Sequence, residues 1–129
     1  ETIVGRRKKV EVFGTDYDTR DGSCIRDYIH VSDLAEAHLK ALDYLKHENQ
    51  DLVINLGTSK GLSVLEIMQI AREVSGHEFN YTLGPRRTGD PAVVLAKADL
   101  AKELLDWKPK HSDAKTLLKT TLRAYRQSS

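Results

Sequence analysis

Two arginines and one aspartate, in separate parts of the chain, have side chains suited to a nucleotide. Arg26 follows a polar loop, whereas Arg87 and Asp90 lie together in the stretch RRTGDPA at positions 86–92. A guanidinium group is planar, always charged and able to contact two phosphate oxygens at once, so two arginines suit a diphosphate. Asp90 could accept hydrogen bonds from sugar hydroxyls, and the backbone around Phe13 could contact the edge of a base. Together these residues predict a nucleotide-sugar site.

Each of these residues also has a structural interpretation. Phe13 ends an expected strand and could simply be part of the core. Arg26 stands next to Asp27, and an exposed pair of this kind contributes less than about 1 kcal/mol to stability. Asp90 precedes Pro91, which is typical of a turn. The side-chain types alone leave both interpretations open.

Other kinds of chemistry find little support in the sequence. The only cysteine, Cys24, cannot form an internal disulfide or build a zinc site alone, and its neighbours do not mark it as reactive. His30 has no nucleophile near it in the sequence, and no Gly-x-Ser-x-Gly motif is present. We therefore predict no catalytic residue and no metal site, and we interpret both Cys24 and His30 as structural.

Composition restricts the class of protein. The 129 residues, 40% of them hydrophobic, suffice for one modest domain, residues 1–129. Twenty basic against nineteen acidic residues give a charge of +1, which favours neither a nucleic-acid partner nor an acidic tail. No apolar run approaches the roughly 20 residues of a membrane span. One cysteine favours the cytoplasm, and a chain that opens at Glu1 is expected to be processed or part of a longer protein.

The elements that must position these residues alternate along the chain. Strands are expected where short apolar or alternating runs occur, at 9–13, 25–31, 52–56 and 79–83. Helices are expected where apolar residues recur at helical spacing, at 34–45, 64–74, 100–105 and from 114 onward. Ser32 and Asp33 suit the start of the first helix, Ser63 and Glu66 form a capping box, and Ser112 suits the start of the last. This order predicts a mixed α/β domain.

Several longer stretches together resemble a known family. Residues 12–38 read VFGTDYDTRDGSCIRDYIHVSDLAEAH, and shorter matches are NLG at 55–57, SVLE at 63–66 and RRTGDPA at 86–92. These stretches closely resemble the UDP-glucose 4-epimerases. The run LLDW at 104–107 is similar to the Leu-Gly-Trp of that family, with Asp106 where glycine is usual. The resemblance covers nearly the whole chain.

The resemblance implies the C-terminal substrate-binding domain of an extended short-chain dehydrogenase/reductase, mixed α/β and without the N-terminal Rossmann core. The substrate-binding positions that it implies are Glu11, Val12, Phe13, Arg26, Arg87 and Asp90. The first three contact uracil largely through their backbone, the two arginines hold the diphosphate, and the aspartate binds the uridine ribose. The family interconverts UDP-glucose and UDP-galactose, with bound NAD taking hydride from C4 and returning it to the other face. A homodimeric parent protein is also implied.

The catalytic motifs of that family do not occur in these 129 residues. The family uses a glycine-rich dinucleotide turn and a Tyr-x-x-x-Lys pair, in which the tyrosine is the general base. Here the five tyrosines are followed, four positions later, by Asp, Ser, Glu, Pro and Ser. We therefore expect NAD to be bound by the missing N-terminal domain and the chain alone to be inactive.

The sequence is also compatible with three other functions. One is a different UDP-sugar epimerase of the same fold, acting on UDP-arabinose or a UDP-N-acetylhexosamine; His30 counts mildly against the arabinose type, which tends to an acidic residue there. A second is a stand-alone, non-catalytic nucleotide-binding module. A third is an interaction domain with solvated arginines, which the joint occurrence of all the motifs disfavours.

Overall fold

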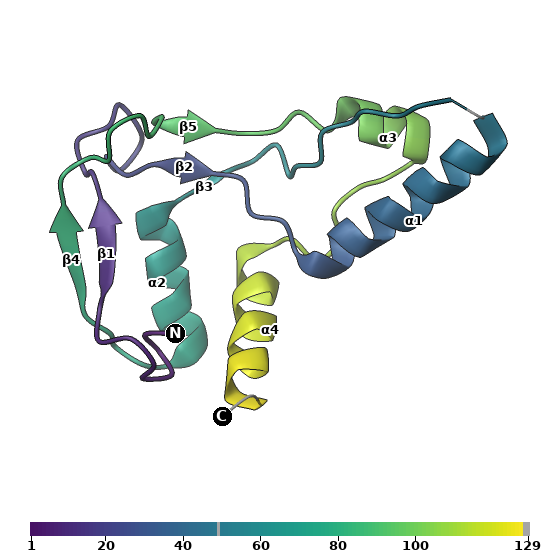
Figure 1. The fold of residues 1–129 in the computed structure, drawn as a ribbon. Helices are drawn as coiled ribbons and strands as arrows, with labels where there is room; N and C mark the ends of the chain where they lie inside the picture. The colour runs from purple at the N-terminus through teal and green to yellow at the C-terminus, as the bar shows by residue number, and fades with distance from the viewer. Residues whose placement is uncertain (49, 128–129) are drawn as a thin grey trace.

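The computed structural model describes residues 1–48 and 50–127, and confirms the predicted mixed α/β class (Figure 1). In chain order the elements are β1 (Val10–Phe13), β2 (Ile25–Arg26), α1 (Val31–Glu48), β3 (Leu62–Ser63), α2 (Val64–Ser75), β4 (Tyr81–Gly84), β5 (Val93–Val94), α3 (Asp99–Leu105) and α4 (Ala114–Gln127). No helix within these residues is long and apolar enough to cross a membrane. The predicted domain 1–129 also includes Asn49 and residues 128–129, which lie outside the described residues.

The strands form two small sheets. β1 and β4 run parallel, in a register that pairs Val10 with Tyr81 and Phe13 with Gly84. β2 lies between β3, to which it is antiparallel, and β5, to which it is parallel. Because β1 and β4 are parallel, their carboxyl ends meet at one edge, where the loop after Phe13 and the turn after Gly84 begin side by side.

We call β1, β4, α2 and α4 the lobe. Met68, Ala71 and Phe79 form its buried cluster, against which Val10 and Leu118 pack. The predicted capping box of α2 is confirmed, since Ser63 Oγ accepts from the Glu66 amide at 3.0 Å and Glu66 accepts from the Ser63 amide at 2.8 Å. The helix ends at Gly76, which has the left-handed conformation (φ +68°) expected of a terminating glycine.

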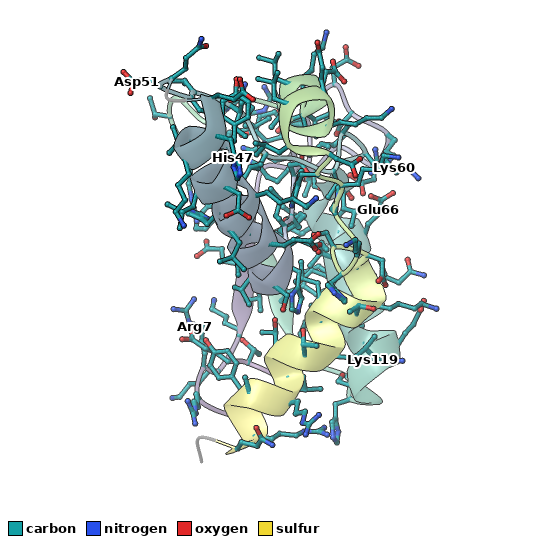
Figure 2. All side chains as sticks on the ribbon, turned by 90° about the vertical axis from the view of Figure 1, so that its right-hand side faces the viewer. Arg7, His47, Asp51, Lys60, Glu66 and Lys119 are labelled. Atoms are coloured by element: carbon teal, nitrogen blue, oxygen red, sulfur yellow. The ribbon has the colours of Figure 1, made fainter. Side chains whose placement is uncertain are left out.

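We call α1, residues 52–56 and α3 the arm, which extends away from the lobe in Figure 1. Its buried cluster comprises Ala37, Ala101, Leu105 and Trp107. The Trp107 indole donates to the Asp33 carbonyl oxygen at 2.9 Å, which ties the end of α3 to α1. In the side view of Figure 2, α1 occupies the upper part of the molecule and α4 the lower part. The two clusters share no residue and lie in different regions, with α2 at the left of Figure 1 and α1 and α3 at the right.

The prediction of a strand at 52–56 is wrong. The segment pairs with no strand in the described part of the chain. Leu52, Ile54 and Leu56 pack against the arm cluster, whereas the Val53 side chain, on the other face, is 93% exposed. A strand requires a partner for its backbone groups, and 52–56 forms no ladder with any segment of residues 1–48 and 50–127.

The first and last helices start differently from the predictions. The strand expected at 25–31 ends at Arg26, and α1 begins at Val31, with His30 Nδ1 accepting from the Ser32 amide at 3.0 Å. α1 continues past the expected end at residue 45 to Glu48. Ser112 does not cap α4, because its hydroxyl donates to the Asp33 carboxylate.

Asp113 takes the capping role that was predicted for Ser112. Its Oδ1 accepts from the Thr116 amide at 2.9 Å, the contact typical of an N-cap residue. Asp33 and Ser112, the cap residues that the sequence favours, instead contact each other across 79 positions.

Candidate functional site

Arg87 and Asp90 lie in one turn, and Arg26 reaches that turn from β2. The turn follows β4 in the chain. Within the turn, the Asp90 amide donates to the Arg87 carbonyl oxygen at 3.2 Å. The Arg26 guanidinium forms an ion pair with the Asp90 carboxylate, and both side chains are about three-quarters buried, at 23% and 26% exposed. Residues 64 positions apart are therefore in contact: the side chain of Arg26 meets that of Asp90, in the same turn as Arg87.

The neighbouring-pair interpretation of Arg26 is wrong. Asp27 turns away and accepts from the Thr58 amide at 2.9 Å, from the Thr58 hydroxyl, and from the Ala96 amide at 3.3 Å. Its role is to tie two loops together beside Gly57, where a Cβ would lie 2.6 Å from the carboxylate. Arg26 instead pairs with Asp90, and its side chain is more buried than that of a solvated surface arginine.

Phe13 supports the other predicted arginine. The Arg87 guanidinium carbon lies 3.8 Å from the centre of the Phe13 ring, which is only half-buried. A stacked guanidinium keeps its N–H edges free, so the ring orients Arg87 while its donors can still bind an anion. Phe13 is therefore more than a core residue, because one face of its ring contacts the exposed Arg87.

Glu11 and Val12 present mainly their backbone. The Val12 side chain is 1% exposed and points into the interior, so it offers no side-chain contact to a ligand. Glu11 is exposed, and its carboxylate lies against Gly84, where a Cβ would be 2.8 Å from Oε1. β4 is the strand that pairs with β1 in the described part of the chain, which makes β1 an edge strand.

Cys24 and Tyr17 lie close to this cluster. Cys24 is 4% exposed, with its sulfur 3.8 Å from Asp90 Oδ2. Tyr17 is 7% exposed, and its hydroxyl has no hydrogen-bond partner among the described residues. Burial raises the pKa of Tyr17, and the adjacent Cys24 and Asp90 raise it further, so the phenol stays neutral. Sequence reasoning did not single out Tyr17, and its type and spacing alone gave no signal of this position.

The residues present do not fit a dinucleotide. A pyrophosphate is typically held where a glycine-rich turn joins a strand to a helix. Gly14 follows β1, but a Cβ there would overlap the Tyr17 ring, and the chain continues into a loop rather than a helix. β3 does run into α2, but the capping box already satisfies amides at that helix start. Neither junction offers a cradle for NAD.

The predicted resemblance is confirmed by comparison with known proteins. Residues 3–57 match the NAD dependent epimerase/dehydratase family. The chain is 45% identical over 118 residues to a UDP-glucose 4-epimerase of Halalkalibacterium halodurans, and the match covers 92% of this chain and 35% of that protein. The chain thus spans about a third of the length of the curated relatives it matches.

Two solved structures have the same fold over almost all of this chain. The UDP-Glc/GlcNAc 4-epimerase of Campylobacter jejuni matches with a TM-score of 0.90 and 46% identity, over 98% of this chain and 38% of that one. A UDP-glucose 4-epimerase of Bifidobacterium longum in complex with NAD+ and UDP matches with a TM-score of 0.88 and 38% identity, over 98% and 37%. The chain therefore shares its sequence and fold with part of each of these larger proteins.

Proposed function

We propose that this chain is the C-terminal, UDP-binding part of a UDP-glucose 4-epimerase, a protein that interconverts UDP-glucose and UDP-galactose. The observation that carries the proposal is the convergence of Arg26, Arg87 and Asp90 on one turn at the carboxyl ends of β1 and β4. In parallel α/β sheets, ligands bind beyond the carboxyl ends of the strands. The homology to these enzymes supports the same function.

In this proposal each side chain has one role. The two arginines bind the diphosphate, and Asp90 accepts hydrogen bonds from the ribose hydroxyls. The backbone of Glu11, Val12 and Phe13, an edge strand, contacts the uracil. Because Arg26 and Asp90 neutralise each other without a ligand, UDP must separate this pair, replacing the carboxylate with phosphate and the guanidinium with hydroxyls. NAD supplies hydride transfer in such enzymes, and it would bind to residues outside this chain.

The exposed apolar surface of the arm supports a longer protein. Large apolar side chains stand in solvent along α1 and the neighbouring segments: Val31, Leu39, Leu42, Leu45, Val53, Leu100 and Leu104. Large apolar patches are unusual on a monomer and mark surfaces that contact other protein. We propose that the remaining two-thirds of the protein covers it, that the protein is a cytoplasmic homodimer, and that the chain alone is catalytically inactive.

A second substrate class fits the same site. The Campylobacter jejuni relative, at 46% identity, is described as a UDP-Glc/GlcNAc 4-epimerase. The residues that converge here contact UDP rather than the sugar, so a UDP-N-acetylhexosamine would occupy them equally well. The test is to assay the full-length protein with UDP-galactose and with UDP-N-acetylgalactosamine. Turnover of both would support the wider substrate class, and turnover of UDP-galactose alone would exclude it.

The decisive experiment is calorimetric titration of UDP into the full-length protein and its Arg26→Ala and Arg26→Lys variants. A hydrogen bond to a charged group contributes about 1.5–3 kcal/mol, so Arg26→Ala should weaken UDP binding roughly ten- to hundredfold. Lysine should restore part of the affinity, because a point charge attracts phosphate but cannot contact two oxygens at once. Equal dissociation constants for all three proteins would remove Arg26 from the site.

A further inference from the structure

The adjacent side chains of Arg86 and Arg87 make different contacts. Arg86 donates from Nε to Asp16 Oδ1 at 2.8 Å, and from a terminal nitrogen to the Asp16 carbonyl oxygen. Its guanidinium carbon also lies 4.2 Å from the centre of the Tyr17 ring. Arg87 stacks on Phe13 and forms no ion pair with any residue in 1–48 or 50–127. The protein therefore holds Arg86 and leaves the donors of Arg87 for a ligand.

The buried ring of Tyr17 supports the guanidinium group of Arg86. Its ring is buried, and its backbone amide donates to the Gly22 carbonyl at 2.9 Å, which closes the loop upon itself. On the other side, Gly14 comes so close that an added Cβ would overlap the ring and lie 2.9 Å from Arg86 Cγ. Neither the ring nor the arginine has room to shift toward β1.

We propose that Asp16, Tyr17 and Arg86 form a clamp that positions Arg87 for the diphosphate of the nucleotide. This inference rests on the proposed function. Consecutive Cα atoms are only about 3.8 Å apart, so fixing the Arg86 side chain restricts the backbone from which Arg87 extends. Arg87 is a binding residue, and Arg86 is a positioning residue that acts through it. A binding group ordered before the ligand arrives loses less entropy when the complex forms.

The charges of the clamp are consistent with this division. The hydrogen bond from Arg86 lowers the pKa of Asp16, so the pair stays ionised and neutral overall in all but strong acid. The side chains of Arg86 and Asp16 are 46% and 74% exposed, and ion pairs in such positions add little to folding stability. Loss of the clamp should therefore change ligand binding while leaving the fold intact.

The test is a double-mutant cycle in the full-length protein, with UDP affinity measured by calorimetry and folding checked by thermal melting. The variants are Arg86→Ala, Arg87→Ala and the two combined. Arg20→Ala is the matched control, because Arg20 lies in the same loop as Asp16, is as exposed as Arg86, and forms its ion pair with Glu66, away from the turn. Asp16→Ala removes the same ion pair from the other side, and replaces Arg86→Ala if that variant does not fold.

We expect Arg87→Ala to weaken UDP binding about ten- to hundredfold, and Arg86→Ala or Asp16→Ala about twofold to tenfold. Arg86→Ala should add nothing in the Arg87→Ala background, since it acts through that side chain. Arg20→Ala should leave the affinity unchanged.

Three results would contradict the clamp, and they are distinguishable. Independent, multiplicative losses in the double variant would mean that Arg86 touches the ligand itself. Unchanged affinity in both Arg86→Ala and Asp16→Ala, with Arg87→Ala impaired, would refute the clamp and leave the proposed function standing. Unchanged affinity in Arg87→Ala would refute the role of Arg87 in the proposed function, and the clamp with it.

Discussion

The lobe and the arm bury their apolar side chains to different extents. In the lobe, α2 is covered by the sheet on one side and by α4 on another, and Leu83 is its one large apolar residue among the described residues that is strongly exposed. In the arm, α1 packs Ala37 and Ala41 against Trp107 but presents Leu39 and Leu42 to solvent. Among the described residues, the lobe thus exposes fewer large apolar side chains than the arm.

The candidate site follows the same division. Its residues come from β1, from the turn after β4 and from β2, and none comes from α1 or α3. The region with fewer exposed apolar side chains therefore holds the proposed ligand contacts. The arm contributes an apolar surface, which is suited to packing against protein rather than to binding a small polar ligand.

The largest expected effect is that of Trp107→Ala. Replacing a fully buried tryptophan with alanine costs about 3–5 kcal/mol, and here the indole bond to Asp33 is lost as well. Because the two clusters are separate, hydrogen exchange should lose protection in α1 and α3 and keep it in α2. Equal loss of protection in α2 would mean that lobe and arm unfold as one unit.

The uncovered face of α1 gives the next prediction. Leu39 is 65% exposed, so Leu39→Ala in the 129-residue chain should change the free energy of unfolding by less than about 0.5 kcal/mol. In the full-length protein the same substitution should cost about 2–5 kcal/mol if the face is buried there. Denaturant titrations of both forms give the comparison, and equal effects in the two would contradict a covered arm.

Asp33 makes the arm sensitive to acid. Burial raises the pKa of Asp33, but hydrogen bonds from Ser112 and from the amides of Lys110 and His111 outweigh this and lower it. Its contribution to stability is therefore present above the unfolded-state pKa of about 3.9, and is lost as the pH falls through the lower folded-state pKa.

Asp33→Asn tests this contribution. Removing the charge should cost about 1.5–3 kcal/mol near neutral pH and should flatten the acid limb of the stability curve. Thermal melting between pH 2 and pH 7 measures both quantities. An unchanged pH dependence in the variant would place the acid sensitivity elsewhere in the molecule.

The smallest expected effects concern the two helix ends. The residue after α2 is Gly76 and the residue after α3 is Asp106, and both have left-handed backbones, with φ of +68° and +46°. Side chains disfavour this conformation, so Asp106→Gly should stabilise the arm by up to about 1 kcal/mol. Gly76→Ala should destabilise the lobe by a similar amount. Chemical denaturation of both variants is the measurement, and two changes of the same sign would exclude backbone strain as the cause.

Local signals in the sequence determined the elements whose physics is local. Ser63 and Glu66 define the start of α2 because a capping box needs only residues three positions apart, and Gly76 ends it because glycine alone adopts its backbone without strain. The turn at Asp90 was equally predictable, because Asp90 precedes Pro91. The residue types of Arg26, Arg87 and Asp90 sufficed to nominate a phosphate and sugar site.

Only the tertiary structure decided which of these residues meet. Strands of two residues, such as β3 and β5, are too short for a periodic pattern, so the sheet that carries Arg26 could not be predicted. The same holds for the partner of Arg26, which is Asp90 rather than the adjacent Asp27, and for the segment 52–56, whose apolar sequence suits a strand. Pairing depends on groups brought together from distant positions, whereas capping and backbone preference act within a few residues, and this is why the sequence reveals the second kind of feature and not the first.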